Sequence, residues 1–335
     1  MADENLRVVL ARRPADVPER EDFALQTAPV PAPGPGQFVV RCDWWSADPA
    51  QRGWALDAPN YLPPVEIGAP MRAFAAGVVV ASRHPDFAEG ARVSGRFGWQ
   101  RYALSDGTEA DAARPPEDLP LSYAVGALGL TGFTAWLGLT RILGVAAGET
   151  LVVSSAAGAV GSVAGQIAAA RGVRAVGIAG GPEKAALARE AFGYAVGLDY
   201  CAGDFEAALA EALPKGTDAY FDNTAGPVSD AVMTHLAQGA RIAICGTAAI
   251  TRWSPLPQGP RVHRQLLVAR ARMEGFLAFD HEEARPQAVA ELAGLIRDGR
   301  LAVREHVLEG PEAARDAIAM LYRGENRGKL VIAVG

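Results

Sequence analysis

Short apolar runs alternate with long helical stretches rich in Ala, Leu and Gly from about residue 121 onward. The runs are Leu151–Val153, Ala175–Ile178, Ala219–Phe221, Arg241–Ile244 and Glu274–Phe279. Strands that alternate with helices form a parallel sheet covered on both faces, and such buried strands read as continuous apolar runs. The pattern therefore predicts an α/β domain with a doubly wound parallel sheet.

The first 125 or so residues follow a different pattern. They are rich in Pro and Gly, and turn signals separate their β-like runs at Phe38–Asp43, Gly77–Ser82 and Ala91–Val93. This spacing predicts a β-rich, irregular lobe.

The C-terminal part returns to β-like runs. Its segments are a helical stretch at Pro286–Asp298, a β-like run at Leu301–Leu308, a helical segment at Pro311–Leu321 and a final run at Lys329–Val334. We assign the final run to the first lobe. The predicted domains are thus a β-rich domain of residues 1–125 and 300–335, and an α/β domain of residues 126–299 inserted into it.

Composition and charge exclude several classes of protein. With 335 residues, of which 50% are hydrophobic and 21% charged, the chain suffices for two cores and lacks the signature of disorder. A formal net charge of −6 without a basic run argues against nucleic acid as a partner. No segment reaches the roughly 18–20 apolar residues of a membrane span, and no signal peptide is visible. We expect a cytoplasmic protein with no membrane partner.

A glycine-containing turn follows the first apolar run of the α/β region. Gly158 would let the backbone approach a pyrophosphate, Gly161 would permit a tight start to the next helix, and Gly165 would allow that helix to pack closely on the strand. The helix N-terminus supplies N–H groups and a partial positive charge. Ala156 replaces the usual first glycine, and close helix packing without a ligand is the alternative. The strand before the turn and the helix after it favour a dinucleotide site.

The end of the second apolar run indicates which dinucleotide binds. An NAD enzyme places a carboxylate there for the ribose 2′-hydroxyl, whereas this sequence has Ala179, Gly180 and Gly181. Lys184 follows just inside the next helix and is a cation suited to a 2′-phosphate, although it could also be an ordinary surface lysine. The sequence therefore favours NADPH over NADH.

Several segments together resemble a known family. They are Ala156–Gly161, Gly165–Ala168, Val176–Lys184, Leu198–Tyr200 and Tyr220–Asn223, with flanking matches at Met71–Arg72, Ser82–Phe87, Gly98–Gln100, Met273–Phe276, Phe279–Asp280 and Gly324–Leu330. The sequence is similar here to the prostaglandin reductase/leukotriene hydroxydehydrogenase group, which includes plant alkenal double-bond reductases and bacterial curcumin-reductase-like enzymes. The resemblance implies a zinc-free medium-chain dehydrogenase/reductase with a GroES-like catalytic domain and a Rossmann domain for NADP(H).

The same resemblance implies a homodimer and a set of cofactor contacts. An edge strand such as Ala240–Ile244 or Arg272–Phe279 would pair across a two-fold axis. In the family, the residues that match Lys184 and Tyr200 hold the 2′-phosphate. The full set of predicted cofactor-binding residues is Thr134, Gly158, Ala159, Val160, Gly161, Gly180, Lys184, Tyr200, Asn223, Cys245, Gly246, Phe276, Leu277 and Asn326.

A metal site is not expected. Catalytic zinc needs about three ligands and structural zinc typically four. The three cysteines, Cys42, Cys201 and Cys245, lie far apart in sequence and are predicted to be free thiols. His84 and His281 stand beside acids but lack the spacing of ligands.

The resemblance implies hydride transfer to the β-carbon of an α,β-unsaturated ketone or aldehyde, followed by protonation of the enolate. The tyrosines that the family commonly presents near this chemistry are missing: the segments read Asp48–Arg52 and Gly246–Trp253, and Trp136 replaces a further aromatic residue. Either the ribose 2′-hydroxyl of the cofactor and solvent suffice to stabilise the enolate, or one of the candidate catalytic residues Tyr61, Arg52 and Thr247 replaces the missing phenol. The candidates for lining a substrate pocket are Trp44, Trp45, Trp54, Tyr61 and Trp99.

Two alternative functions stay open. The first is an NADPH:quinone oxidoreductase of the same superfamily. The second is a structural or sensor protein that binds NADPH without turnover, which the missing tyrosines would suit. A fold by itself does not decide between them.

Overall fold

The chain folds into two compact units in a computed structural model that describes residues 4–251 and 255–335. The first unit comprises Met1–Leu130 and Glu305–Gly335, and the second unit comprises Thr131–Arg304. The division thus falls at residues 130 and 304, where the sequence pattern predicts 125 and 299.

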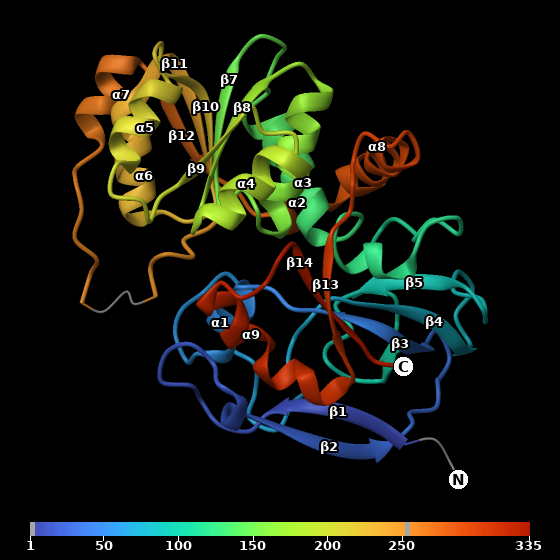
Figure 1. Ribbon diagram of the computed structural model, residues 1–335. Helices are drawn as coiled ribbons and strands as arrows, with labels where there is room; N and C mark the ends of the chain where they lie inside the picture. The colour runs from blue at the N-terminus through green and yellow to red at the C-terminus, as the bar shows by residue number, and fades with distance from the viewer. Residues whose placement is uncertain (1–3, 252–254) are drawn as a thin grey trace. The chain divides into compact units, whose positions relative to one another are not determined.

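The second unit contains a six-stranded sheet whose neighbouring strands are all parallel (Figure 1). Its strands are β7 (Thr150–Ser154), β8 (Arg174–Ala179), β9 (Val196–Asp199), β10 (Thr217–Asp222), β11 (Leu236–Ile244) and β12 (Arg272–Gly275). They are arranged in the order β12-β11-β10-β7-β8-β9, which is the strand order of a Rossmann fold. The predicted doubly wound sheet is confirmed.

Helices cover both faces of this sheet. The helices on the sheet are α3 (Ala159–Ala170), α4 (Pro182–Ala191), α5 (Phe205–Ala212), α6 (Gly226–Val232) and α7 (His263–Ala269). The unit also contains α8 (Arg285–Arg297) and most of α2 (Leu130–Leu137), which begins at the boundary between the units. Figure 1 shows α5, α6 and α7 on one side of the sheet and α3 and α4 on the other. Val152 of β7 and Tyr220 of β10 are paired across the two strands, and they lie in one buried cluster with Val228 and Val232 of α6 on one face of the sheet. Within the described ranges, no helix is both long and apolar enough to cross a membrane.

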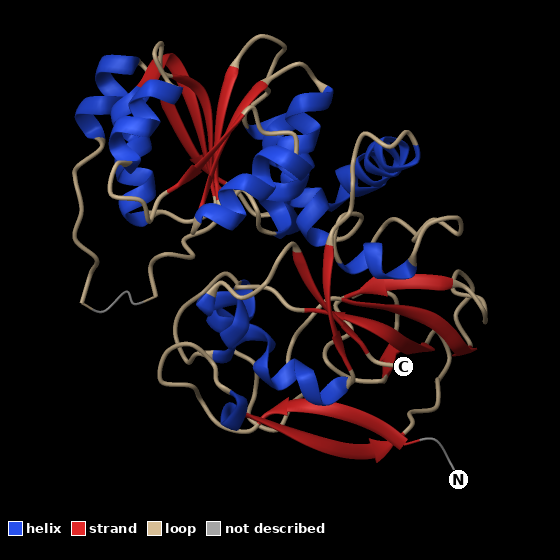
Figure 2. Cartoon of the chain, in the orientation of Figure 1, coloured by secondary structure: helices blue, strands red, loops and turns tan. Residues whose placement is uncertain are grey.

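The first unit is rich in β-structure (Figure 2). Its elements are β1 (Glu4–Leu10), β2 (Phe23–Pro29), β3 (Phe38–Ser46), α1 (Ala50–Ala55), β4 (Ala75–Ser82), β5 (Arg92–Gly95), β6 (Tyr102–Ser105), β13 (Glu305–Glu309), α9 (Ala314–Arg323) and β14 (Lys329–Ala333). Strands β1 and β2 form an antiparallel pair, and the larger sheet has the order β13-β14-β3-β4-β5, with β6 paired to β3. The final strand, β14, therefore lies in this unit, as the sequence pattern predicts.

Three details of the predicted elements are wrong. The run predicted at Glu274–Phe279 is strand only at Glu274 and Gly275, because β12 spans Arg272–Gly275. Phe276 leaves the sheet and packs edge-on against Phe221, with ring centroids 6.1 Å apart. In the run predicted at Leu301–Leu308, β13 begins only at Glu305. The Gln166 side chain of α3 holds the preceding connection, donating to Ala302 O at 3.1 Å and accepting from Ala302 N at 2.6 Å.

The third correction concerns the edge of the parallel sheet. Strand β11, which contains Ala240–Ile244, lies between β10 and β12 and is not an edge strand. Strand β12 is the edge strand on this side, and all four of its residues are exposed.

Candidate functional site

The carboxyl ends of β7 and β10 form the switch point of the parallel sheet. These strands are hydrogen-bonded neighbours, but the chain continues from β7 to β8 and β9 on one side, and from β10 to β11 and β12 on the other. Ligands of doubly wound sheets bind at this point, outside the carboxyl ends of the strands. Here β7 ends at Ser154 and β10 ends at Asp222.

The turn after β7 leads directly into the N-terminus of α3. Ser155 takes a positive φ of 54°, and Gly158 is the N-cap of the 12-residue helix α3, which begins at Ala159. A Cβ on Gly161 would lie 2.3 Å from the carbonyl oxygen of Ser155, so only glycine fits at this close approach. The first-turn N–H groups of α3, including those of Ala159 and Val160, have no acceptor within the helix. The turn thus presents bare backbone and donors of the kind that bind a pyrophosphate.

The structure also shows why alanine replaces the usual first glycine. Ala156 is fully buried, and its Cβ lies where a Cβ on Gly177 of β8 would approach to 2.7 Å. The missing side chain at Gly177 therefore makes room for Ala156. Gly165 was predicted to let α3 pack closely on the preceding strand, but its close neighbours lie in the segment before β9. A Cβ on Gly165 would lie 2.4 Å from Phe192 O and 2.4 Å from the ring of Tyr194.

The ends of β8 and β9 lie side by side, with Ala179 paired to Asp199. Gly181, at φ 87°, is the N-cap of α4, and Lys184 lies in the first turn of that helix. The carboxylate of Asp199 accepts hydrogen bonds from the N–H of Gly181 at 2.7 Å and of Cys201 at 2.9 Å. Asp199, the last residue of β9, is thereby bound to the turn between β8 and α4.

Tyr200 stands beside the same turn. A Cβ on Gly180 would come within 3.1 Å of the Tyr200 ring, and the tyrosine side chain is about half exposed, at 48%. Partial burial raises the pKa of Tyr200, with smaller contributions from Cys201 and Asp199, so the phenol is protonated at neutral pH. The structure thus brings Gly180, Lys184 and Tyr200 together around the end of β8.

Asn223 is bound at the switch point by two hydrogen bonds to Ser154. Its backbone N–H donates to Ser154 Oγ at 2.8 Å, and its side-chain amide donates to the Ser154 carbonyl oxygen at 2.8 Å. Cys245 and Gly246 follow β11, and their N–H groups donate to the carbonyl oxygen of Asp222 at 2.8 and 3.1 Å. Burial raises the pKa of the Cys245 thiol to about 12, so this cysteine stays neutral. The residues predicted to line the nicotinamide path in this unit therefore follow neighbouring strands.

The other predicted cofactor residues lie in different places. Thr134 lies in α2, and Phe276 and Leu277 follow β12 and are partly buried. Asn326 belongs to the first unit, is 9% exposed, and donates from its side chain to Gly328 O at 2.8 Å. The cofactor roles of all these residues stay predictions.

The candidate catalytic residues differ in their surroundings. Tyr61 is 44% exposed and meets the Trp54 ring edge-on, with centroids 6.4 Å apart. Arg52 is 8% exposed, donates to Asp16 Oδ1 at 2.7 Å and lies over the ring of Tyr322. Its charge is therefore already paired inside the first unit.

Thr247 lies in the turn after β11 and is partly buried. Its carbonyl oxygen accepts a hydrogen bond from Ile250 N at 2.9 Å. The rest of the segment predicted to matter here, from Arg252 through Trp253, lies outside the described residues.

The candidate pocket tryptophans are largely core residues. Trp45, Trp54 and Trp99 are at most 1% exposed, and the indoles of Trp45 and Trp99 donate to Gln100 O and Ser46 O at 3.1 and 3.0 Å. Trp44 is partly buried against an apolar cluster of the first unit. For three of the four, core packing is thus established, and a role in lining a pocket stays a prediction.

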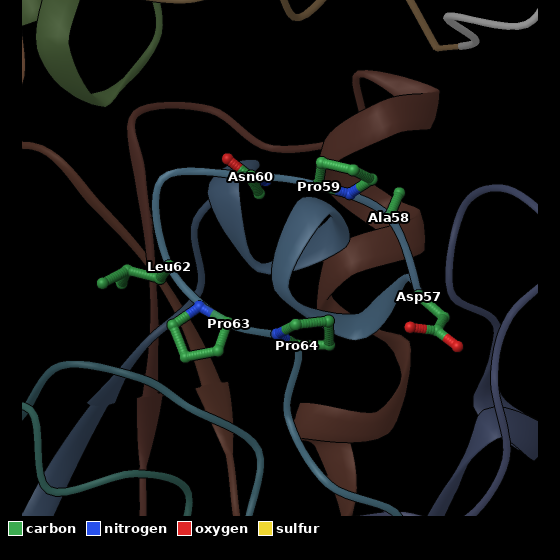
Figure 3. Close-up of a pocket in the computed structure, with 7 residues that line it drawn as sticks. All are labelled: Asp57, Ala58, Pro59, Asn60, Leu62, Pro63 and Pro64. Carbon is green, nitrogen blue, oxygen red and sulfur yellow. The ribbon is translucent and has the colours of Figure 1, made fainter.

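A depression of about 350 Å³ lies on the loop that runs around α1 (Figure 3). Its lining residues are Asp57, Ala58, Pro59, Asn60, Leu62, Pro63 and Pro64. The loop carries Tyr61, and Arg72 fastens it by donating to Pro63 O at 2.9 Å. Three prolines make this loop stiff around the exposed tyrosine.

Cysteine and histidine side chains are not gathered into a metal site. All three cysteines are free thiols, as predicted, with Cys201 exposed and Cys42 buried. His84 accepts a hydrogen bond from Asp86 N at its Nδ1. Over residues 4–251 and 255–335, no three His, Cys, Asp or Glu side chains form a group that could hold a metal ion.

Sequence reasoning did not assign roles to Ser154, Asp199 and Asp222, which hold these turns. A signal was present, because each is a polar residue that directly follows an apolar residue at the end of its strand. Its meaning depends on which strands are neighbours, and only the folded sheet shows that.

Known proteins match this chain along nearly its whole length. A family model described as an N-terminal domain of oxidoreductase matches residues 7–112, and one described as a zinc-binding dehydrogenase matches residues 159–294. The NADPH-dependent curcumin reductase of Escherichia coli (strain K12) is 40% identical, over 98% of this chain and 97% of the relative. Prostaglandin reductase 1 of Bos taurus is 36% identical, over 94% of both chains. The crystal structure of CurA from Vibrio vulnificus in complex with NADPH superposes with a TM-score of 0.91 at 39% identity, covering 98% of this chain and 99% of that one.

Proposed function

Because the chain belongs to the zinc-free prostaglandin reductase and alkenal reductase family of medium-chain dehydrogenases/reductases, we propose that it reduces the activated carbon–carbon double bond of a small enone or enal with NADPH. The observation that carries the proposal is the 40% identity, over 98% of the chain, to an NADPH-dependent reductase. The Rossmann switch point supports it, because the residues expected around the cofactor follow neighbouring strand ends.

The residues of the second unit fit an NADP(H) dinucleotide. A Cβ on Gly161 would clash with backbone, so the turn before α3 is kept bare, and the helix start offers N–H donors to a pyrophosphate. Lys184 and Tyr200 would hold the 2′-phosphate as cation and hydroxyl donor. Asn223 would face the nicotinamide half. When bound, NADPH supplies the hydride, and the protein supplies orientation and electrostatics.

The reaction adds a hydride to the β-carbon and a proton to the α-carbon of the substrate. Between these additions the carbonyl oxygen carries negative charge and needs a hydrogen-bond donor. Tyr61 is the first candidate for this donor, because its side chain is exposed whereas the Arg52 charge is paired with Asp16. Thr247 is the second. Replacing Tyr61 by Phe is expected to lower kcat about tenfold or more while leaving the Kd for NADPH unchanged.

The proposal is tested by the loss of NADPH absorbance with a panel of 2-alkenals, enones, aryl enones and quinones. NADH and a metal chelator serve as controls. Chelator-insensitive turnover of an enone, faster with NADPH than with NADH, is the expected result. Turnover of quinones alone would favour the quinone oxidoreductase alternative. Tight NADPH binding without turnover of any substrate would favour a structural or sensor protein.

We also propose a homodimer that pairs the edge strands β12. If two copies pair antiparallel about Met273, Arg272 of each copy lies opposite Glu274 of the other, which makes the strand self-complementary in charge. Exposed apolar side chains lie on the same strand and on α7, where Met273 is 38% and Leu267 is 78% exposed. Light scattering is expected to give the mass of two chains, and Glu274→Arg is expected to shift it toward one. A single-chain mass for the unaltered protein would refute the dimer.

A cytoplasmic location is proposed from the cysteines. All three are free thiols, and an oxidising compartment would act on the exposed Cys201. Separation of cell fractions with a tagged chain tests this location.

A further inference from the structure

The side chain of Asp222 is fully buried at the carboxyl end of β10, at the centre of the switch point. One carboxylate oxygen, Oδ1, accepts hydrogen bonds from the N–H groups of Thr224 and Ala225, both at 2.9 Å. The same oxygen accepts from the Ser154 hydroxyl of β7 at 3.2 Å. Asp222 therefore connects the turn after β10 to the end of the neighbouring strand.

The turn that Asp222 holds is strained. Ala225 has φ 56° and ψ −159°, a backbone conformation that side-chain-bearing residues rarely adopt and that glycine adopts freely. Such a conformation persists only when its surroundings enforce it. The hydrogen bonds from Thr224 and Ala225 to a buried carboxylate supply that enforcement, since bonds to a charged acceptor are stronger than those to a neutral one.

Asp222 also reaches Asn223 through Ser154. The Ser154 hydroxyl donates to Asp222 and accepts from the backbone N–H of Asn223, while the Ser154 carbonyl accepts from the Asn223 side-chain amide. The orientation of the Asn223 carboxamide is thus set by a residue whose own rotamer is set by Asp222.

The second carboxylate oxygen of Asp222, Oδ2, makes no hydrogen bond to this turn. Among the described residues, Asp222 Oδ2 is buried without a hydrogen-bond partner, and so is the phenol oxygen of Tyr220. That phenol lies close to Asp222 and to the hydroxyls of Ser154 and Ser229, but it reaches none of them with hydrogen-bonding geometry. Burial raises the pKa of Tyr220 well above 10, so the phenol is neutral beside the carboxylate. A residue needed only to close a turn does not require a buried charge with an unused oxygen.

We propose that Asp222 is a positioning residue for the nicotinamide half of NADP(H), because it enforces the strained turn at Ala225 and, through Ser154, orients the Asn223 carboxamide. The inference rests on the proposed function for its ligand. It assigns no contact with the cofactor to Asp222 itself.

The test compares two probes on the same variants. NADPH reports the whole cofactor site, and adenosine 2′,5′-bisphosphate, which lacks the nicotinamide half, reports the 2′-phosphate end alone. Asp222→Ala is expected to raise the Kd for NADPH about tenfold or more, to lower kcat up to about 100-fold, and to leave the Kd for the bisphosphate within about twofold. Asp222→Asn keeps an acceptor oxygen and is expected to recover most of the loss.

Asp218→Ala is the matched control. Asp218 lies at the other end of the same strand and accepts a hydrogen bond from Thr150 N at 2.8 Å, so it also joins β10 to β7. Removing it is expected to leave the Kd values for both probes unchanged. Equal losses of NADPH affinity in Asp218→Ala and Asp222→Ala would overturn the proposal, because the effect would then be general destabilisation of the sheet.

Ala225→Gly supplies a second, independent comparison. If Asp222 acts by enforcing the strained turn, glycine at position 225 is expected to restore part of the NADPH affinity of Asp222→Ala. If Asp222→Ala fails to fold, the test uses the double variant Asp222→Ala/Ala225→Gly and the single variant Ser154→Ala. Both are expected to bind NADPH more weakly and to keep the Kd for the bisphosphate within about twofold. Unchanged NADPH affinity in a folded Asp222→Ala or Ser154→Ala protein would overturn the proposal. A wild-type chain that binds NADPH but reduces no alkene would refute only the proposed reaction, because the comparison of Kd values does not need turnover.

Discussion

Polar side chains have different partners in the two units of this chain. In the second unit, Ser154, Asp199 and Asp222 stand at strand ends within the expected cofactor site, where Ser154 bonds to Asp222 and the two carboxyl groups bond to turn residues. In the first unit, buried charged side chains bond to each other in the interior, as Lys329 does with Asp48. The strand ends of the second unit therefore combine tight backbone turns with polar support, whereas buried ion pairs hold the interior of the first unit.

The largest effect is expected at the buried ion pair of the first unit. Lys329 is 4% exposed and donates to Ser46 Oγ at 2.7 Å, Ala47 O at 2.7 Å and Asp48 Oδ1 at 2.8 Å. Lys329→Met would leave the Asp48 charge buried without its cation, at a cost of about 3–5 kcal/mol. Urea unfolding measures this loss, and Lys215→Met, at an exposed position, is expected to change stability little. Equal stability of the two variants would show that Lys329 is not the partner that Asp48 needs.

A somewhat smaller effect is expected where the second unit depends on bare backbone. In Gly161→Ala the new Cβ would lie 2.3 Å from Ser155 O and 2.7 Å from Ala156 Cα, so the turn before α3 must shift. Backbone atoms cannot move aside as the end of a flexible side chain can. We therefore expect NADPH binding to weaken by about 2–3 kcal/mol. Gly203→Ala is the control, because a Cβ there meets nothing within 4 Å. Calorimetric titration with NADPH gives both values, and retained affinity in Gly161→Ala would contradict the close approach.

The next smaller effect is expected at the end of the site that would hold the 2′-phosphate. Lys184→Ala removes the cation in the first turn of α4 and is expected to weaken NADPH binding about 10- to 30-fold, or about 1.5–2 kcal/mol. NADH lacks the phosphate, so its Kd is expected to stay the same. The ratio of the two Kd values is the measurement, and a parallel loss for both cofactors would show that Lys184 acts on the fold and not on the phosphate.

The same contrast explains what the sequence could and could not predict. The parallel sheet follows from the apolar runs and the dinucleotide turn from the glycine spacing, whereas the order of the strands became known only from the structure. The surroundings of Arg52 could not be predicted, because its partner Asp16 lies 36 positions away and no pattern links the two. Lys329 and Asp48 are separated by 281 positions and present the same difficulty.

Strand ends were predicted less well for a related reason. The apolar side chain of Phe276 continues the β-like pattern past Gly275, yet its ring packs against Phe221 and the strand stops. Packing partners that are distant in sequence decide such positions. The tryptophans show this too, since Trp45, Trp54 and Trp99 have the chemistry of a pocket wall and the burial of a core.

The smallest effect is expected at the strained turn, and it has the opposite sign. Ala225 carries a side chain at φ 56°, so Ala225→Gly is expected to relieve about 1–3 kcal/mol of strain in the folded protein. Glycine also gives the unfolded chain more conformational freedom, which lowers the free energy of unfolding by about 0.4–1 kcal/mol. We expect a net gain near 1 kcal/mol, which raises the Tm by about 2–4 °C. Ala210→Gly is the matched control: it lies exposed inside α5, where glycine is expected to lower stability by a similar amount. If both glycines destabilise, Ala225 is not strained, and the buried carboxylate of Asp222 has no unfavourable turn to hold.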